Sequence, residues 1–175
     1  RIVKNPSAEL LAERQNLDGS IVLATMEGAR PLLVEIQALV NPTNFGYPKR
    51  TASGFDLNRL NLLVAVLEKR TKLKLADKDI YVNVVGGLKL NDPAADLAVA
   101  MAIASASAGR SLDEGAVVFG EIGLGGEVRS ATNWQVRIKE AKKLGFTYAI
   151  APKVHKDKFI KGVSDMRQAL IDYLQ

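Results

Sequence analysis

The sequence contains no cysteine and a single histidine, His155. Without cysteine, disulfides and thiolate metal sites are excluded, and a reducing compartment is favoured. With a single histidine, a metal ion would have to take nearly all of its ligands from carboxylates, and a Ser–His or Cys–His catalytic centre is improbable. We therefore expect no metal site in these residues, and we expect His155 to be an exposed or hydrogen-bonded ring.

Long apolar runs and nucleotide-binding motifs are missing as well. No apolar run reaches the roughly 18 residues that a membrane span needs, and the first residues show no basic segment followed by an apolar one, as a signal peptide would. No G-x-x-x-x-G-K-[ST] string occurs, so the sequence offers no P-loop for ATP. These absences predict a cytoplasmic location and no membrane partner.

Charge of one sign is only moderately in excess. Lys and Arg outnumber Asp and Glu by 24 to 19, and the sequence pI is about 9.5. Such a surplus fits either a lysine-rich surface or a polyanion partner, and only clustering distinguishes the two. The 175 residues suffice for one compact domain. Because the sequence opens with Arg1, we expect it to be a domain excised from a longer polypeptide, with residues 1–18 as a lead-in and 19–175 as the globular core.

Periodicity predicts an N-terminal β-hairpin followed by alternating helices and strands. Residues 20–40 alternate around a turn at 28–31, and residues 41–54 are rich in Asn, Pro and Gly, which predicts a long loop. Helices are expected over 6–14, 55–70, 93–109, 133–146 and 164–174, with Asn5 or Ser7 capping the first and Ser164 the last. The order favours a mixed α/β (α+β) two-layer domain with parallel βα crossovers.

Two segments resemble the proteolytic domain of the Lon family. They are GGLKLNDPAADLAVAMAIASA (86–106) and VVFGEIGLGGEVR (117–129), the latter followed by RIKEAKKLGFTYAIAP (137–152). The resemblance implies the Lon proteolytic-domain fold, in which a serine in the loop before a small-residue helix is activated by a lysine.

At the two positions of that catalytic dyad this chain has Ala94 and Gln135. Alanine has no nucleophilic atom, and a glutamine amide is too weakly basic to act as a general base. Lys139 lies one helical turn further on, but it would have no oxygen at position 94 to activate. We therefore expect no catalytic residues and no peptidase activity, and we expect Asp96 to cap or pair near the loop.

Longer stretches are similar to the C-terminal domain of the bacterial RadA (Sms) family of DNA repair proteins. EGARPLLVEIQALV (27–40) and VNVVGG (82–87) carry this resemblance, which covers nearly the whole chain. It implies a homo-hexameric ring, duplex DNA as a partner, and branch migration in homologous recombination driven by the RecA-like ATPase domain of a DNA-dependent ATPase or helicase. ATP, Mg and Zn are then expected only in domains outside this sequence. SATNWQVRI (130–138) departs from the family's R-P-V-P pattern, which leaves the turn after Arg129 undefined.

The most suggestive DNA-binding segment is NFGYPKRTASG (44–54), where Lys49 and Arg50 follow Phe45 and Tyr47, with Arg59 on the next helix. Basic residues interleaved with aromatics suit phosphate contact and base stacking. A second basic run, KVHKDKFIKG (153–162), is more typical of a solvated surface. The alternative is an assembly domain that contacts only protein; an active Ser–Lys peptidase is less favoured than either of these. Trp134 fits either the core or an interface.

Overall fold

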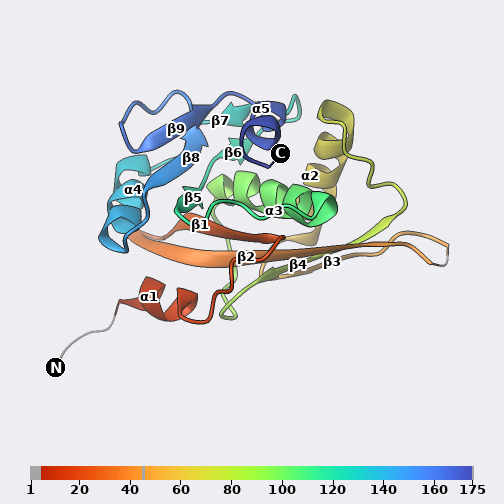
Figure 1. The fold of residues 1–175 in the computed structure, drawn as a ribbon, viewed down its shortest axis with the longest axis horizontal. Helices are drawn as coiled ribbons and strands as arrows, with labels where there is room; N and C mark the ends of the chain where they lie inside the picture. The colour runs from red at the N-terminus through yellow and green to blue at the C-terminus, as the bar shows by residue number, and fades with distance from the viewer. Residues whose placement is uncertain (1–4, 45, 175) are drawn as a thin grey trace.

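The computed structural model describes residues 5–44 and 46–174, which form a seven-stranded sheet, a two-stranded sheet and five α-helices (Figure 1). The strands are β1 (Ser20–Glu27), β2 (Arg30–Pro42), β3 (Arg50–Ser53), β4 (Lys78–Val84), β5 (Ala116–Val118), β6 (Glu121–Ile122), β7 (Val128–Arg129), β8 (Tyr148–Pro152) and β9 (Ile160–Val163). The helices are α1 (Pro6–Leu11), α2 (Leu57–Arg70), the 3-10 turn η1 (Pro93–Ala95), α3 (Asp96–Ala108), α4 (Trp134–Lys143) and α5 (Met166–Tyr173).

The large sheet has the strand order β3-β4-β2-β1-β5-β8-β9. β1, β2 and β4 pair antiparallel, whereas β3 pairs parallel to β4, and β1, β5, β8 and β9 pair parallel to one another. The expected hairpin, the parallel crossovers of the second half and the mixed α/β class are therefore confirmed.

Helices lie on both faces of this twisted sheet (Figure 1). α2, α3 and α5 lie on one face, and α1 and α4 lie on the other, where the Ser7 hydroxyl donates to Glu140 of α4. The chain thus has three layers near β1 and two layers, as expected from the sequence, over β4 and β3. α1 packs on β2, so this helix, which lies within the expected lead-in, is part of the packed domain.

The core is organised around α3, whose residues Asp96 to Ser105 are all buried. Its alanines let the helix approach β1 and β2 closely on one side and α2 and α5 on the other. A helix that is apolar all round, as this one is, is a central core helix rather than a surface helix. Ser105 is also buried, and its hydroxyl accepts the N–H of Gly19 at 2.8 Å.

The prediction from the sequence missed two short edge strands and placed one helix cap at the wrong residue. β3 lies in the expected loop 41–54, and β9 lies in the lysine-rich segment. Asn5 caps α1 as predicted, but the prediction for the last helix was wrong by one residue. Asp165, not Ser164, caps α5, because its carboxylate accepts the N–H of Gln168. None of the helices in the described ranges is long and apolar enough to cross a membrane.

Because α3 is packed on every side, enlarging it is expected to be costly. We predict that Ala100→Leu lowers the free energy of unfolding by about 1–3 kcal/mol through overpacking. Ala65→Leu, the same change on the exposed side of α2, should alter it by less than about 0.5 kcal/mol. Urea denaturation of both variants checks this, and equal effects would show that α3 does not limit packing.

Candidate functional site

The loop that resembles the Lon nucleophile loop forms η1, a single 3-10 turn between β4 and α3. Ala94 occupies its centre and is 2% exposed. Its N–H donates to Asp92 Oδ1 at 3.1 Å, and its carbonyl accepts the N–H of Gly120 at 2.8 Å. Both backbone polar groups of Ala94 are therefore used inside the fold.

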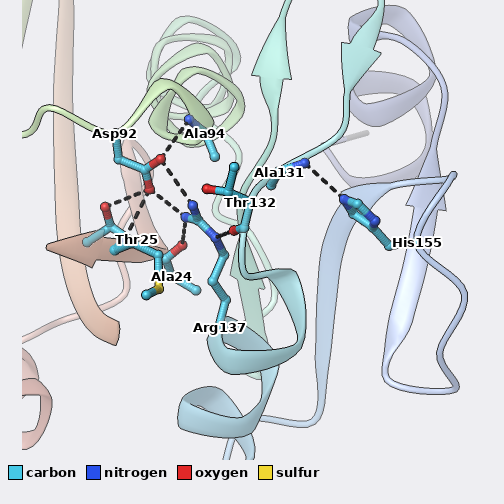
Figure 2. A network of polar contacts seen from close by, with 9 residues as sticks. Ala24, Thr25, Asp92, Ala94, Ala131, Thr132, Arg137 and His155 are labelled. Carbon is cyan, nitrogen blue, oxygen red and sulfur yellow. Dashed lines mark hydrogen bonds and ion pairs between the residues drawn. The ribbon is translucent and has the colours of Figure 1, made fainter. Parts of the chain in front are cut away.

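Asp92 and Arg137 form a buried ion pair beside this turn (Figure 2). The Arg137 side chain is 0% exposed, and its two terminal nitrogens lie 2.5 and 3.1 Å from the Asp92 oxygens. The guanidinium also donates to the carbonyls of Ala24 and Thr132, each at 2.9 Å. Arg137 thus connects the loop, β1 and the start of α4.

The Asp92 carboxylate accepts hydrogen bonds from several donors. Besides Arg137 and Ala94, it accepts the Thr25 hydroxyl at 2.9 Å and the N–H of Met26 at 3.2 Å. Burial by itself raises the pKa of Asp92, but the hydrogen bonds and charge of Arg137, with the N–H donors of Ala94 and Met26, outweigh it. The net effect lowers the pKa of Asp92 below its ordinary value, so the pair is ionised.

A second ion pair lies on the other side of Ala94. Asp96, at the first position of α3 and 1% exposed, accepts from Arg59 of α2, whose Nε lies 2.9 Å from Asp96 Oδ1. Asp96 also accepts the N–H of Ile122, and Arg59 donates to the carbonyl of that residue. The hydrogen bond to Asp96 raises the pKa of Arg59 above its ordinary value. The expectation that Asp96 pairs near the loop is confirmed.

Gly120 closes the loop from a third side. Its N–H donates to the carbonyl of Ala94, its carbonyl accepts the N–H of Leu97, and its φ is 154°. A Cβ at this position would lie 2.9 Å from Val128 Cγ1, so a side chain does not fit.

In the described structure, the α4 position that matches the catalytic lysine is exposed. Gln135 and Lys139 are both exposed on α4, and the buried side chain that α4 directs at the loop belongs to Arg137. An arginine stays protonated in proteins and cannot accept a proton. The carboxylate of Asp92 meanwhile holds the N–H of Ala94. The arrangement can therefore fix the loop, and the methyl group of Ala94 has no atom that can attack a carbonyl.

The turn after Arg129, which the sequence left undefined, is held by His155. The ring Nε2 accepts the N–H of Ala131 at 2.9 Å (Figure 2). The ring also stacks on Trp134, with centroids 4.9 Å apart. Burial, with a smaller contribution from the charge of Arg137, lowers the pKa of His155 and favours the neutral, accepting ring. In the described part of the chain, no group of three His, Asp or Glu side chains could hold a metal ion.

The three predicted DNA-binding residues lie in different surroundings. Lys49 is exposed, and its N–H donates to Asp79 at 2.7 Å. Arg50 starts β3 and donates to the carbonyl of Leu75, while its Nε is buried without a partner in the described structure. Arg59 is already engaged by Asp96. Tyr47 is 92% exposed, and Phe45 lies outside the described residues.

Sequence reasoning missed the role of Arg137 and the basic segment 69–74. Arg137 occupies the buried stripe of α4 together with Ile138 and Ala141, and a charged residue at such a position signals a buried partner. The segment KRTKLK carries four cations, Lys69, Arg70, Lys72 and Lys74, all exposed. Its charge density exceeds that of the loop 44–54.

The buried pair should be far more important for stability than an exposed one. We predict that Arg137→Met lowers the free energy of unfolding by about 3–5 kcal/mol, because it leaves the Asp92 charge buried and unpaired. The matched change Arg129→Met, in the exposed pair with Glu127, should cost less than about 1 kcal/mol. Adding Asp92→Ala to Arg137→Met should recover part of the loss. Denaturant unfolding checks this order, and equal losses at positions 129 and 137 would contradict it.

Comparison with known proteins agrees with this geometry. Residues 59–155 match a family model described as "ChlI: Subunit ChlI of Mg-chelatase". Among curated proteins, the chain is 47% identical over 151 residues to the DNA repair protein RadA of Aquifex aeolicus, 51% over 151 residues to that of Halalkalibacterium halodurans, and 47% over 176 residues to that of Bacillus subtilis. These matches cover 86%, 86% and 96% of the chain.

The same matches cover 34%, 33% and 38% of the relatives' own lengths, so the chain spans roughly a third of each. The family model and the mixed sheet together identify the fold as ChlI-like, or Lon-protease-like. The chain therefore belongs to the family of ChlI-like, Lon-like domains, and it is homologous to the C-terminal portion of bacterial RadA.

Proposed function

We propose that this chain is a non-proteolytic Lon-like domain of a RadA-type DNA repair protein, serving as a hexameric ring scaffold and as a duplex DNA-binding module. The observation that carries the proposal is an identity of 47–51% over 86–96% of the chain to proteins named DNA repair protein RadA. The two ion pairs around Ala94 support the scaffold role, because they hold the former nucleophile loop in one conformation.

The wider activity belongs to the same proposal. The full-length protein would be a cytoplasmic, DNA-dependent ATPase or helicase that drives branch migration in homologous recombination. The residues of this chain do not fit ATP or zinc, since there is no P-loop and no cysteine. Nucleotide, Mg and Zn would be bound by a RecA-like ATPase domain and a zinc motif elsewhere in the protein, and this domain would contact that ATPase domain.

DNA binding is proposed to use the loop that ends in Lys49 and Arg50. Lys49 is exposed beside the strand edge, and Tyr47 projects fully into solvent. Phosphate contacts from such a loop position the protein without reading base sequence. Arg59 remains a proposed auxiliary contact, with 32% of its side chain exposed and its guanidinium on Asp96. An assembly domain without DNA contact is the alternative that the DNA measurement distinguishes.

We predict that restoring the dyad residues does not restore peptidase activity. In Ala94→Ser with Gln135→Lys, Asp92 still holds the N–H of residue 94, and Arg137 still occupies the space between α4 and the loop. Incubation with casein should give no fragments, and a fluorophosphonate should label neither this variant nor the wild type. A Lon-family peptidase is the positive control, and labelling of any serine in the wild type would overturn the non-proteolytic assignment.

We predict that duplex DNA binds without sequence preference and that Lys49→Ala with Arg50→Ala weakens binding. Each lost phosphate contact flattens the slope of log affinity against log salt by about 0.9, so the double change should reduce it by nearly twice that amount. Fluorescence anisotropy over a salt series measures the slope.

The matched control is Lys156→Ala with Lys158→Ala, which removes the same charge from the exposed C-terminal run. Its slope should stay close to that of the wild type. Loss of binding in the control variant would move the DNA surface to residues 153–162, and absence of any DNA binding by the wild type would favour the assembly-only alternative. Arg50 donates to the carbonyl of Leu75, so its loss could destabilise the fold. Thermal unfolding of both variants checks that they remain folded.

A further inference from the structure

The C-terminal part of β2, together with β4 and β3, forms a hollow of about 610 Å³, and none of its lining residues belongs to one of the described helices. Segment 13–18, between α1 and β1, forms one wall. The strand register arranges the floor in two rows, Gln37–Asn83–Ser53 and Leu39–Tyr81–Thr51. We call this hollow the acidic trough.

The charge of the trough is opposite to that of the chain. Glu13, Asp18 and Glu35 line it, and none of the described lining residues is Lys or Arg, although the chain has a net charge of +5. Three carboxylates without a cation repel phosphates, so nucleic acid does not suit this surface. No three acidic or histidine side chains in the described ranges converge as metal ligands, which leaves a cationic protein surface as the matching partner.

Glu35 gives the trough a buried negative charge. It is 4% exposed, and its Oε2 accepts the Ser20 hydroxyl at 2.6 Å and lies 3.5 Å from Gln37 Nε2. None of the described cations forms an ion pair with it. A buried carboxylate held only by neutral donors retains a field that attracts positive charge.

Two large apolar side chains accompany these acids. Leu17 is 60% exposed on the wall, and Leu39 is 55% exposed in the middle of β2. Neither is covered by another element of the domain. An apolar centre surrounded by charged and polar groups is the composition of a protein interface.

A complementary surface lies on the other face of the sheet, where the segment after α2 meets α5 (Figure 1). We call it the basic corner; it comprises Lys69, Arg70, Lys72, Lys74 and Arg167, all exposed. None of these five pairs with an acidic side chain of the described residues. The exposed Asp172 adds one negative charge to the corner, which therefore still has an excess of positive charge. Leu170 and Ile171 line an apolar groove of about 270 Å³ beside Lys72 and Arg167.

We propose that the acidic trough of one copy of this chain binds the basic corner of a second copy. Opposite charges then face each other around apolar centres contributed by Leu17 and Leu39 on one side and by Ile171 on the other. Because trough and corner lie on opposite faces of the sheet, each copy has both surfaces free to continue the contact. A repeated head-to-tail contact of this kind closes into a ring when the rotation fits. The inference rests on the proposed self-assembly and assigns the two surfaces that produce it.

Charge reversal tests the contact. Glu13→Lys with Asp18→Lys reverses the trough, and Lys72→Glu with Lys74→Glu and Arg167→Glu reverses the corner; all five side chains are exposed. Each of these two variants should assemble at least about tenfold more weakly than the wild type, since like charges then face each other across the interface. Sedimentation velocity over a concentration series measures this.

Mixing the trough variant with the corner variant provides the sharper result. The basic trough of the first then meets the acidic corner of the second, and the acidic trough of the second meets the basic corner of the first. An equimolar mixture should therefore assemble again with alternating copies, and so should the variant that combines all five changes. Lys153→Glu with Lys156→Glu and Lys158→Glu, three exposed residues with the same change in charge as the corner variant, should assemble like the wild type.

The possible failures are distinguishable. If the wild type assembles and neither reversal weakens it, or if mixing does not restore assembly, other surfaces form the ring and this inference is overturned while the ring stands. If the wild type stays monomeric at every concentration, both the ring and its surfaces fail, whereas DNA binding is measured separately. If the corner reversal abolishes DNA binding and leaves assembly unchanged, the basic corner is a DNA surface and not the partner of the trough.

Discussion

Two carboxylates lie on either side of Ala94 inside the fold, and each is neutralised by an arginine from a different helix. Asp92 pairs with Arg137 of α4, and Asp96 pairs with Arg59 of α2. A buried charge is tolerated only when it is paired and its remaining lone pairs are hydrogen-bonded, and both conditions hold here. The positions of α2, α4 and the start of α3 relative to one another depend on these two pairs.

The same pairs fix the conformation of the loop that resembles the Lon nucleophile loop. A nucleophile loop needs free backbone donors and a neighbouring base, whereas here Asp92 occupies the N–H of Ala94, and an arginine takes the place of a base. The charged groups around Ala94 satisfy one another. The loop thereby forms a junction between β1, α3 and α4.

The sequence predicted the features that depend on local patterns. Alternation predicted the β1–β2 hairpin, the cap at Asn5 followed from its position before Pro6, and the small-residue run predicted α3. β3 and β9 escaped detection because each is a four-residue edge strand inside a segment rich in turn or lysine residues. Arg137 is bound 45 residues away in sequence, at Asp92, and a pairing of that kind leaves no periodic signal in a single sequence. The charge of the trough was hidden for the same reason, since Glu13, Glu35 and their neighbours meet only after the sheet has formed.

The position of Arg137 also has a consequence for how the chain folds. The hairpin β1–β2 requires only neighbouring residues, so it can form as soon as its turn closes. The guanidinium of Arg137, by contrast, must meet Ala24 and Asp92 together, which joins segments 113 and 45 residues apart. Contacts across such sequence separations form slowly, because the intervening chain must lose its entropy first. Until that junction closes, the small-residue helix α3 lacks its final packing, and apolar surface that is exposed at that stage can associate with other chains.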